Sequence, residues 1–288
     1  MKRGYLVFIA TYVLLQTPAA NSQRLTLSVR TDEVRVDVLV SDHEKPVMGL
    51  RASDFEVRDN GVKQEIQFAG ARQIPTSVIL VLDMSGSVAG KFQDDLKDAG
   101  NDLLGGLKNN DLAALITFSY SVKLDAPLTT DIPLVEAAIN GTMRHSSGTT
   151  SLIDAAYAGL IYADSEADRP LLILFSDGLD TSSHLKDEAV FNSARRSDVT
   201  VYAVSVGQLK DRKFLRELCK ISGGDFLEIE STEDISAVFV SILNEFRQRY
   251  LLTYTPEGVD QSGWHELEVR VRNRSHDRIL ARPGYIAD

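Results

Sequence analysis

The chain has 288 residues, of which 43% are hydrophobic and 25% are charged, so it can bury a core and is not expected to be disordered. Its formal net charge of −10 argues against a nucleic-acid partner, because phosphate binding requires clustered Lys and Arg side chains. Cys219 is the only cysteine, which excludes an internal disulfide. Its helical surroundings are typical of a buried thiol rather than a nucleophile.

The first residues have the three parts of a secretory signal. Lys2 and Arg3 are followed by an apolar run over residues 5–15 and then by the small residues Ala19 and Ala20. This run is shorter than the roughly 20 residues that a membrane-spanning helix needs. We therefore expect residues 1–22 to be a cleaved signal and the protein to be exported, to the periplasm or outside the cell. The alternative is an uncleaved segment, which would place the protein at a membrane.

Residues 24–72 have the pattern of β-strands. Apolar residues occupy every second position from Val34 to Val40, as in a strand with one buried face. Further along, Asn60-Gly61 separates two short apolar segments and favours a hairpin turn with positive φ angles. No helical period occurs in this segment, which we expect to be β-rich.

From Pro75 the pattern changes to alternating strands and helices. Residues 77–82 form a continuous apolar run, typical of a strand buried on both faces of a parallel sheet. Similar runs span residues 112–118, 171–175, 199–206 and 226–229, and residues 121–128 suit an antiparallel edge strand. Helix-like stretches span residues 91–107, 132–143, 151–165, 186–197, 211–221 and 233–249. This alternation predicts an α/β domain over residues 73–249, with a doubly wound, mostly parallel sheet and helices on both faces.

After residue 249 the strand pattern returns. Residues 250–254 form one apolar run, alternation over residues 267–271 indicates a second strand, and residues 278–281 suit a third. Neither this segment nor residues 24–72 is long enough to bury much surface alone. We therefore predict that residues 24–72 and 250–288 pack together as an all-β, sandwich-like domain beside the α/β domain.

Polar residues that follow buried strands are the candidates for a binding site, because ligands of doubly wound sheets bind at the carboxyl ends of the strands. Asp83 ends the first buried run, and Ser85 and Ser87 follow at alternate positions. Gly86 allows the loop to turn tightly enough to bring both hydroxyls to one point. Hard cations such as Mg²⁺ prefer oxygen ligands of this kind and retain several waters.

Two further segments carry similar groups. Thr149 and Thr150 follow Gly148 at the start of a helix-like stretch, and Asp177-Gly178 follows the strand run over residues 171–175. Each segment alone is also consistent with a helix cap or a turn. An Asp-x-Ser-x-Ser string alone is equally weak evidence. The combination of the three segments after buried strands is what predicts a metal site.

These residues resemble the metal-ion-dependent adhesion site, or MIDAS, of von Willebrand factor A domains, which have an integrin I-like fold. That site takes Asp-x-Ser-x-Ser from one loop, a threonine from a second and an aspartate from a third. The flanks resemble, more loosely, a group of exported bacterial proteins related to this family and common in acidobacteria. The resemblance implies the metal ligands Asp83, Ser85, Ser87, Thr150 and Asp177, with Thr149 as the alternative threonine. It also implies that Gly86, Thr149 and Gly178 lie where a partner would bind.

The resemblance implies binding rather than catalysis. Mg²⁺ is the expected metal, with Mn²⁺ or Ca²⁺ as alternatives, and the partner is a protein that offers an Asp or Glu side chain. A second hypothesis is an assembly protein whose β flanks make the main contact, while the metal only stabilises a loop. A hydrolase is the least favoured reading, since Ser85 lies in no Gly-x-Ser-x-Gly elbow and no motif joins a histidine to it.

Nucleotide and zinc chemistry also lack support in the sequence. Neither a Gly-x-x-x-x-Gly-Lys-Ser/Thr loop nor a Gly-x-Gly-x-x-Gly loop occurs, and the five histidines lack the spacing of zinc ligands. Asp125, Asp154 and Asp180 lie near the candidate loops, where a solvated carboxylate or a cap is the more common role. Asp154 falls on a helix-like stretch, from which it can hydrogen-bond to a loop.

Overall fold

The computed structural model describes residues 33–43, 45–70, 75–86, 90–142, 148–177, 180–207, 212–274 and 276–287. The expected signal over residues 1–22 lies outside these ranges, as do Ser87 and Gly178. None of the helices in the described ranges is long and apolar enough to span a membrane.

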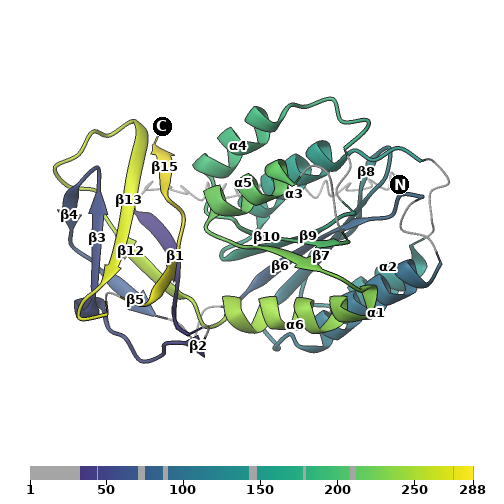
Figure 1. Cartoon of the computed structure of the whole chain (residues 1–288), viewed down its shortest axis with the longest axis horizontal. Helices are drawn as coiled ribbons and strands as arrows, with labels where there is room; N and C mark the ends of the chain where they lie inside the picture. The colour runs from purple at the N-terminus through teal and green to yellow at the C-terminus, as the bar shows by residue number, and fades with distance from the viewer. Residues whose placement is uncertain are drawn as a thin grey trace, which may run out of the picture. The chain divides into compact units, whose positions relative to one another are not determined.

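The central sheet has six strands in the order β11-β10-β9-β6-β7-β8 (Figure 1). Its strands are β6 (Ser77–Asp83), β7 (Leu112–Phe118), β8 (Val122–Thr129), β9 (Pro170–Phe175), β10 (Thr200–Val206) and β11 (Phe226–Ile229). All neighbours are parallel except β8, which pairs antiparallel with β7 at one edge. Because β7 lies on one side of β6 and β9 on the other, the connections diverge there, and this is where doubly wound sheets bind ligands.

Helices cover both faces of this sheet (Figure 1). They are α1 (Lys91–Gly105), α2 (Ile132–Gly141), α3 (Leu152–Glu166), α4 (Asp187–Arg196), α5 (Lys213–Ser222) and α6 (Ile235–Phe246). One core contains Val78, Leu80 and Leu82 of β6 together with residues of α1, α2 and α6. The other contains Ile79 and Val81 of β6 with residues of α3, α4 and α5. Alternate residues of β6 thus feed opposite cores, as the continuous apolar run predicts, and the predicted fold class is confirmed.

Two antiparallel sheets flank this α/β unit, and each combines strands from both ends of the described chain. The first has the order β14-β1-β12-β5, with β2 also paired to β1, and the second has the order β15-β13-β3-β4. The strands from the N-terminal side are β1 (Val34–Asp42), β2 (Lys45–Pro46), β3 (Phe55–Asp59), β4 (Val62–Gln64) and β5 (Phe68–Gly70). Those from the C-terminal side are β12 (Tyr250–Tyr254), β13 (Gly263–Val271), β14 (Arg278–Leu280) and β15 (Gly284–Ala287).

Side chains of both sheets form one apolar cluster, which includes Val36 and Val38 of β1, Val57 of β3, and Leu252 of β12. The register pairs β1 with β12 and β3 with β13, so that strands distant in sequence lie side by side. Shared strands explain how two short flanks bury a common core. The domain boundaries at residues 72 and 250 stay a prediction.

Asp59 anchors a polar cluster inside this β core. Its carboxylate is fully buried, and it accepts hydrogen bonds from the hydroxyls of Tyr254 and Tyr285, both at 2.9 Å. Nδ1 of the buried His265 lies 2.7 Å from the other carboxylate oxygen. The four residues come from β3, β12, β15 and β13, so the cluster joins the N-terminal strands to the C-terminal ones.

Replacing Asp59 with Ala is expected to lower the free energy of unfolding by about 3–5 kcal/mol, because three buried polar partners would lose their acceptor. Urea denaturation followed by the fluorescence of Trp264, the only tryptophan, measures this loss. Glu266→Ala, at an exposed position of the same strand β13, is the control and should change stability by less than about 0.5 kcal/mol. Equal effects of the two changes would contradict the role given to Asp59.

A buried arginine connects the α/β unit to the flanking sheets. Arg169, directly before β9, donates from Nε and Nη2 to one carboxylate oxygen of Asp37 in β1, at 3.0 and 2.5 Å. Its Nη2 also donates to the carbonyl oxygens of Phe246 (3.4 Å) and Arg249 (3.2 Å), at the end of α6. The guanidinium stacks over the Phe246 ring at 4.7 Å from its centroid. Arg169 therefore holds β1 and the end of α6 in one arrangement.

Candidate metal site

Asp83 is the last residue of β6, and its side chain is fully buried. One carboxylate oxygen accepts a hydrogen bond from the main-chain N–H of Ser85 at 2.9 Å, and the other accepts from the hydroxyl of Ser176 at 2.8 Å. The N–H of Met84 donates to the carbonyl oxygen of Phe118 at 2.7 Å, which ties the start of the loop to β7. These contacts fix the carboxylate and fold the loop after β6 back over it.

The electrostatic environment of Asp83 favours a cation. Burial raises the pKa of its carboxyl group to about 6, although the hydrogen bonds from Ser85 and Ser176 act in the opposite direction. The nearby carboxylate of Asp177 raises the pKa further, and no basic side chain is among the main influences. A buried carboxylate beside a second carboxylate is costly without a positive charge. The site therefore has the electrostatic character of a cation-binding site. Its negative charge comes from two side chains, Asp83 and Asp177.

Thr150 is brought to the same edge of the sheet by its main chain. It is buried, and its N–H donates to the hydroxyl of Thr181 at 2.8 Å, while its carbonyl oxygen accepts from the N–H of Thr181 at 2.9 Å. The N–H of the next residue, Ser151, donates to the carbonyl oxygen of Ser119 at 2.7 Å. Thr150 is thus held between the loop after β7 and the loop after β9. Thr149, the alternative threonine, is exposed.

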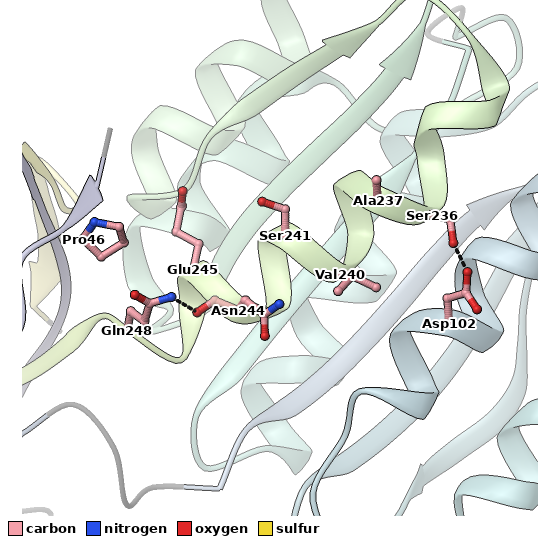
Figure 2. Close-up of a pocket in the computed structure, with 9 residues that line it drawn as sticks. All are labelled: Pro46, Asp102, Ser236, Ala237, Val240, Ser241, Asn244, Glu245 and Gln248. Atoms are coloured by element: carbon pink, nitrogen blue, oxygen red, sulfur yellow. Dashed lines mark hydrogen bonds between the residues drawn. The ribbon is translucent and has the colours of Figure 1, made fainter. Parts of the chain in front are cut away.

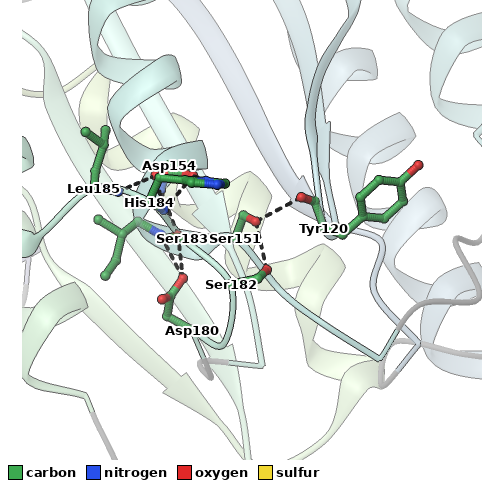
Figure 3. A network of polar contacts seen from close by, with 9 residues as sticks. Tyr120, Ser151, Asp154, Asp180, Ser182, Ser183, His184 and Leu185 are labelled. Atoms are coloured by element: carbon green, nitrogen blue, oxygen red, sulfur yellow. Dashed lines mark hydrogen bonds and ion pairs between the residues drawn. The ribbon is translucent and has the colours of Figure 1, made fainter.

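Asp154 fixes the loop after β9 against α3 (Figure 3). Its carboxylate accepts hydrogen bonds from the main-chain N–H groups of His184 (3.0 Å) and Leu185 (2.9 Å). Burial acts to raise the pKa of Asp154, but these two donors outweigh it and the pKa is lowered. Asp180, in the same loop, accepts from the hydroxyl of Ser183 at 2.5 Å. Asp154 therefore positions the loop that carries Thr181.

Strand register places the predicted residues at one edge. Asp83 is the partner of Phe118 in β7, and Leu82 is the partner of Phe175 in β9, so Asp83 lies beside the residues that lead to Asp177. Ser85 is buried, Gly86 is exposed, and Asp177 is half-buried. The structure thus brings four of the five predicted ligands to this edge, which are Asp83, Ser85, Thr150 and Asp177. Ser87 and Gly178 lie outside the described residues, so their placement stays a prediction.

Sequence reasoning missed several residues at this edge. Ser176, directly before Asp177, is a hydrogen-bond donor to Asp83. Ser119 and Ser205, which lie at the carboxyl ends of β7 and β10, have buried hydroxyls without a hydrogen-bond partner in the described structure. Ser119 directly follows Phe118, the strand partner of Asp83, and an unpartnered hydroxyl there fits a hydrated cation, whose waters need such partners. All three serines lie at the end of a predicted strand, and this position could have identified them from the sequence.

Asp125, which the sequence places near the candidate loops, has partners of its own. Asp125 accepts from the hydroxyl of Thr117 and pairs with Lys123, so its charge is balanced along the edge strand β8. No cluster of three or more His, Cys, Asp or Glu side chains suited to a metal occurs within the described ranges. The candidate site at Asp83 is not a cluster of this kind, because it has only two carboxylates and its other proposed ligands are hydroxyls.

A groove of about 750 Å³ runs along the outer side of α6 (Figure 2). Its two acidic side chains are already bonded, since Asp102 accepts from the hydroxyl of Ser236 and Glu245 accepts from that of Tyr202.

Comparison with known proteins defines the family. The model of the von Willebrand factor type A domain matches residues 77–240, more than half of the chain, and the protein belongs to this family. Inter-alpha-trypsin inhibitor heavy chain H2 of Mus musculus is 24% identical over 189 residues, which cover 60% of this chain and 20% of that protein. The chain thus spans about a fifth of the length of this curated relative.

Two solved structures share the fold. The von Willebrand factor type A protein from Catenulispora acidiphila has a TM-score of 0.53 and 14% identity, covering 86% of this chain and 75% of its own. Proximal thread matrix protein 1 from the mussel byssus, with a zinc-occupied MIDAS motif, has a TM-score of 0.51 and 18% identity. That match covers 61% of this chain and 48% of the mussel protein. At these identities the likeness concerns the fold alone.

Proposed function

We propose that this protein is an exported binding module in which a divalent metal at the carboxyl edge of the central sheet binds an acidic side chain of a partner protein. The observation that carries the proposal is the buried carboxylate of Asp83, which has Asp177 nearby and no basic side chain among the main influences on its pKa. The proposed ligands are Asp83, Ser85, Ser87, Thr150 and Asp177. Mg²⁺ is the proposed metal, with Mn²⁺ and Ca²⁺ as alternatives.

The composition of this ligand set favours binding over catalysis. Three of the five proposed ligands are neutral hydroxyls, and five protein ligands leave at least one octahedral position of Mg²⁺ open to an anionic oxygen from outside. The carboxylate of a partner's Asp or Glu supplies such an oxygen. The zinc-occupied MIDAS motif of the mussel thread protein supports a divalent metal at a site of this kind. Members of this family are generally interaction modules, which agrees with the same role.

Export is the proposed setting of this interaction. The support is the sequence of residues 1–22, in which basic, apolar and small residues follow one another. The net charge of −10 supports a protein partner rather than nucleic acid, and the sequence offers no nucleotide-binding loop.

Short immobilised peptides with a central Asp or Glu provide the test of this function. We expect the protein to bind them in Mg²⁺, to lose them in a chelator, and to ignore matched peptides with Asn or Gln. Thr150→Val should abolish the metal-dependent part, whereas Thr129→Val, on the edge strand β8, should leave it unchanged. Equal binding to the acidic and amide peptides would contradict the proposal.

Thr181 offers a test of how the site is held together. Thr181→Val removes the hydroxyl that accepts from the N–H of Thr150, and we expect the metal affinity to fall about tenfold or more, as for other groups that orient ligands. Thr181→Ser keeps the hydroxyl and should keep the affinity. Calorimetric titration with Mg²⁺ measures both variants. Wild-type affinity in the Val variant would show that Thr181 does not position Thr150.

An assembly role for the β flanks is the second candidate. It is favoured by exposed apolar side chains there, since Phe68 in β5 is 45% exposed and Trp264 in β13 is 46% exposed. Sedimentation velocity of the wild type and of Phe68→Ser distinguishes the two functions. Self-association that is lost in Phe68→Ser and unaffected by a chelator would favour assembly.

A further inference from the structure

Tyr120 is a large exposed side chain beside the candidate metal site. It lies two residues beyond Phe118, the strand partner of Asp83, so its main chain is within about 7 Å of that position along the chain. The residue is 56% exposed, more than any other large hydrophobic residue in the described ranges. Its side chain therefore offers exposed surface at the edge where the metal is proposed to bind.

The main chain around Tyr120 is held by hydrogen bonds (Figure 3). Ser119 N–H donates to the carbonyl oxygen of Ser121 at 3.1 Å, which closes a tight turn. The hydroxyl of Ser151 donates to the carbonyl oxygen of Tyr120 at 3.1 Å and lies 2.9 Å from the hydroxyl of Ser182. Because Ser151 directly follows Thr150, one set of bonds fixes both the candidate ligand and the base of the Tyr120 side chain.

The charge of this edge explains why an uncharged contact is needed. The edge carries Asp177 and the exposed Asp180, and the whole chain has a net charge of −10. An acidic partner is attracted by the metal but repelled by the other acidic groups of the chain, and an apolar contact adds affinity without that repulsion. A tyrosine on a fixed main chain supplies such surface, since little conformational entropy is lost when it is covered.

We propose that Tyr120 forms the second contact of the partner, packing its ring against an apolar side chain that neighbours the acidic residue bound to the metal. This inference rests on the proposed function and adds the chemistry of the partner segment, which is an acidic residue next to an aliphatic or aromatic one. The other exposed large hydrophobic residues lie elsewhere. Val62, Phe68 and Trp264 belong to the flanking sheets, and Leu134 lies in the first turn of α2, which follows the end of β8 at the amino edge. Ile161 lies in the second half of α3, and Leu124 lies on the edge strand β8 opposite Ile116.

Synthetic peptides with a central Asp flanked by Ala, Leu, Phe or Lys test this assignment in the presence of Mg²⁺. For the wild type, Leu or Phe beside the Asp should tighten binding about tenfold relative to Ala, the effect of one well-packed interface contact. Tyr120→Ala should lose this preference while it still binds acidic peptides in a metal-dependent way. Tyr120→Phe retains the ring and should retain the preference, and Leu134→Ala is the matched control at a distant exposed site.

The outcomes separate the two levels of the proposal. A preference for Leu or Phe that persists in Tyr120→Ala overturns the role of Tyr120 and leaves the metal-dependent function intact. A wild type without any preference does the same. Acidic peptides that fail to bind the wild type in Mg²⁺ overturn the proposed function, and the role of Tyr120 with it.

Discussion

Replacing Arg169 with Met is expected to lower the free energy of unfolding by about 3–5 kcal/mol, the usual cost of removing one partner from a buried ion pair. Arg169 is 2% exposed, and its loss leaves the carboxylate of Asp37 without its cation inside the protein. The carbonyl oxygens of Phe246 and Arg249 would lose a donor as well. The effect combines an unpaired charge with two weakened main-chain contacts at the junction between α6 and the flanking sheets.

Chemical denaturation of three variants tests this account of Arg169. Arg270→Met removes an exposed partner of Glu268 and should cost less than about 1 kcal/mol. The double variant Arg169→Met, Asp37→Leu removes both buried charges and should recover much of the stability lost by Arg169→Met alone. A double variant that is as unstable as the sum of its two single changes would show that the ion pair is not the cause.

Asp83→Asn is expected to stabilise the metal-free protein at neutral pH by up to about 3 kcal/mol, because burial raises the pKa of the carboxyl group to about 6 and ionising it at neutral pH costs that much. The folded-state pKa of Asp83 is about 6, above the ordinary aspartate value of 3.8, so the folded protein binds the proton more tightly than the unfolded chain. This contribution to stability is present below the unfolded pKa and is lost as the pH rises through about 6. An amide at this position carries no charge, so the loss disappears.

Thermal or urea unfolding in a chelator, from acidic to neutral pH, measures this effect. The wild type should lose stability across the interval between the two pKa values, and Asp83→Asn should show a flatter profile. The amide can still accept from the N–H of Ser85 and can donate to the hydroxyl of Ser176, so the local contacts persist. A metal-free Asn variant less stable than the wild type at neutral pH would contradict the cost assigned to the buried carboxylate.

The elements of the α/β unit could be predicted from sequence because their apolar periodicity is strong. The run over residues 77–82 corresponds to β6, and the helix predicted over residues 233–249 corresponds to α6 (Ile235–Phe246). The differences lie at the ends, where a 3₁₀ turn (Thr232–Asp234) precedes α6 and capping contacts decide the last residues. We predicted that the two flanks pack together because neither is long enough to bury much surface alone. This argument indicates which segments combine but not the register of their strands.

The candidate site was predictable only in part. Strand ends identified Asp83 and Asp177, since a carboxylate after a buried run is visible in the sequence. The supporting contacts were not predictable, because Thr181 and Leu185 lie about thirty residues from Thr150 and Asp154 and meet them only when β9 is placed beside β6. The same reason hides the pair of Arg169 with Asp37, whose positions differ by 132 residues.

Direct titration of the purified protein with Mg²⁺, Mn²⁺ and Ca²⁺ tests whether the carboxyl edge of the central sheet binds a divalent metal. A metal that binds only the folded state stabilises it by mass action, by about 2.7 kcal/mol at a free concentration of one hundred times Kd. We expect saturable binding to the wild type with a rise in Tm, and neither response in Asp83→Asn or Thr150→Val. A wild type that shows no binding heat and no change in Tm with any of the three metals would show that the carboxyl edge holds no such metal.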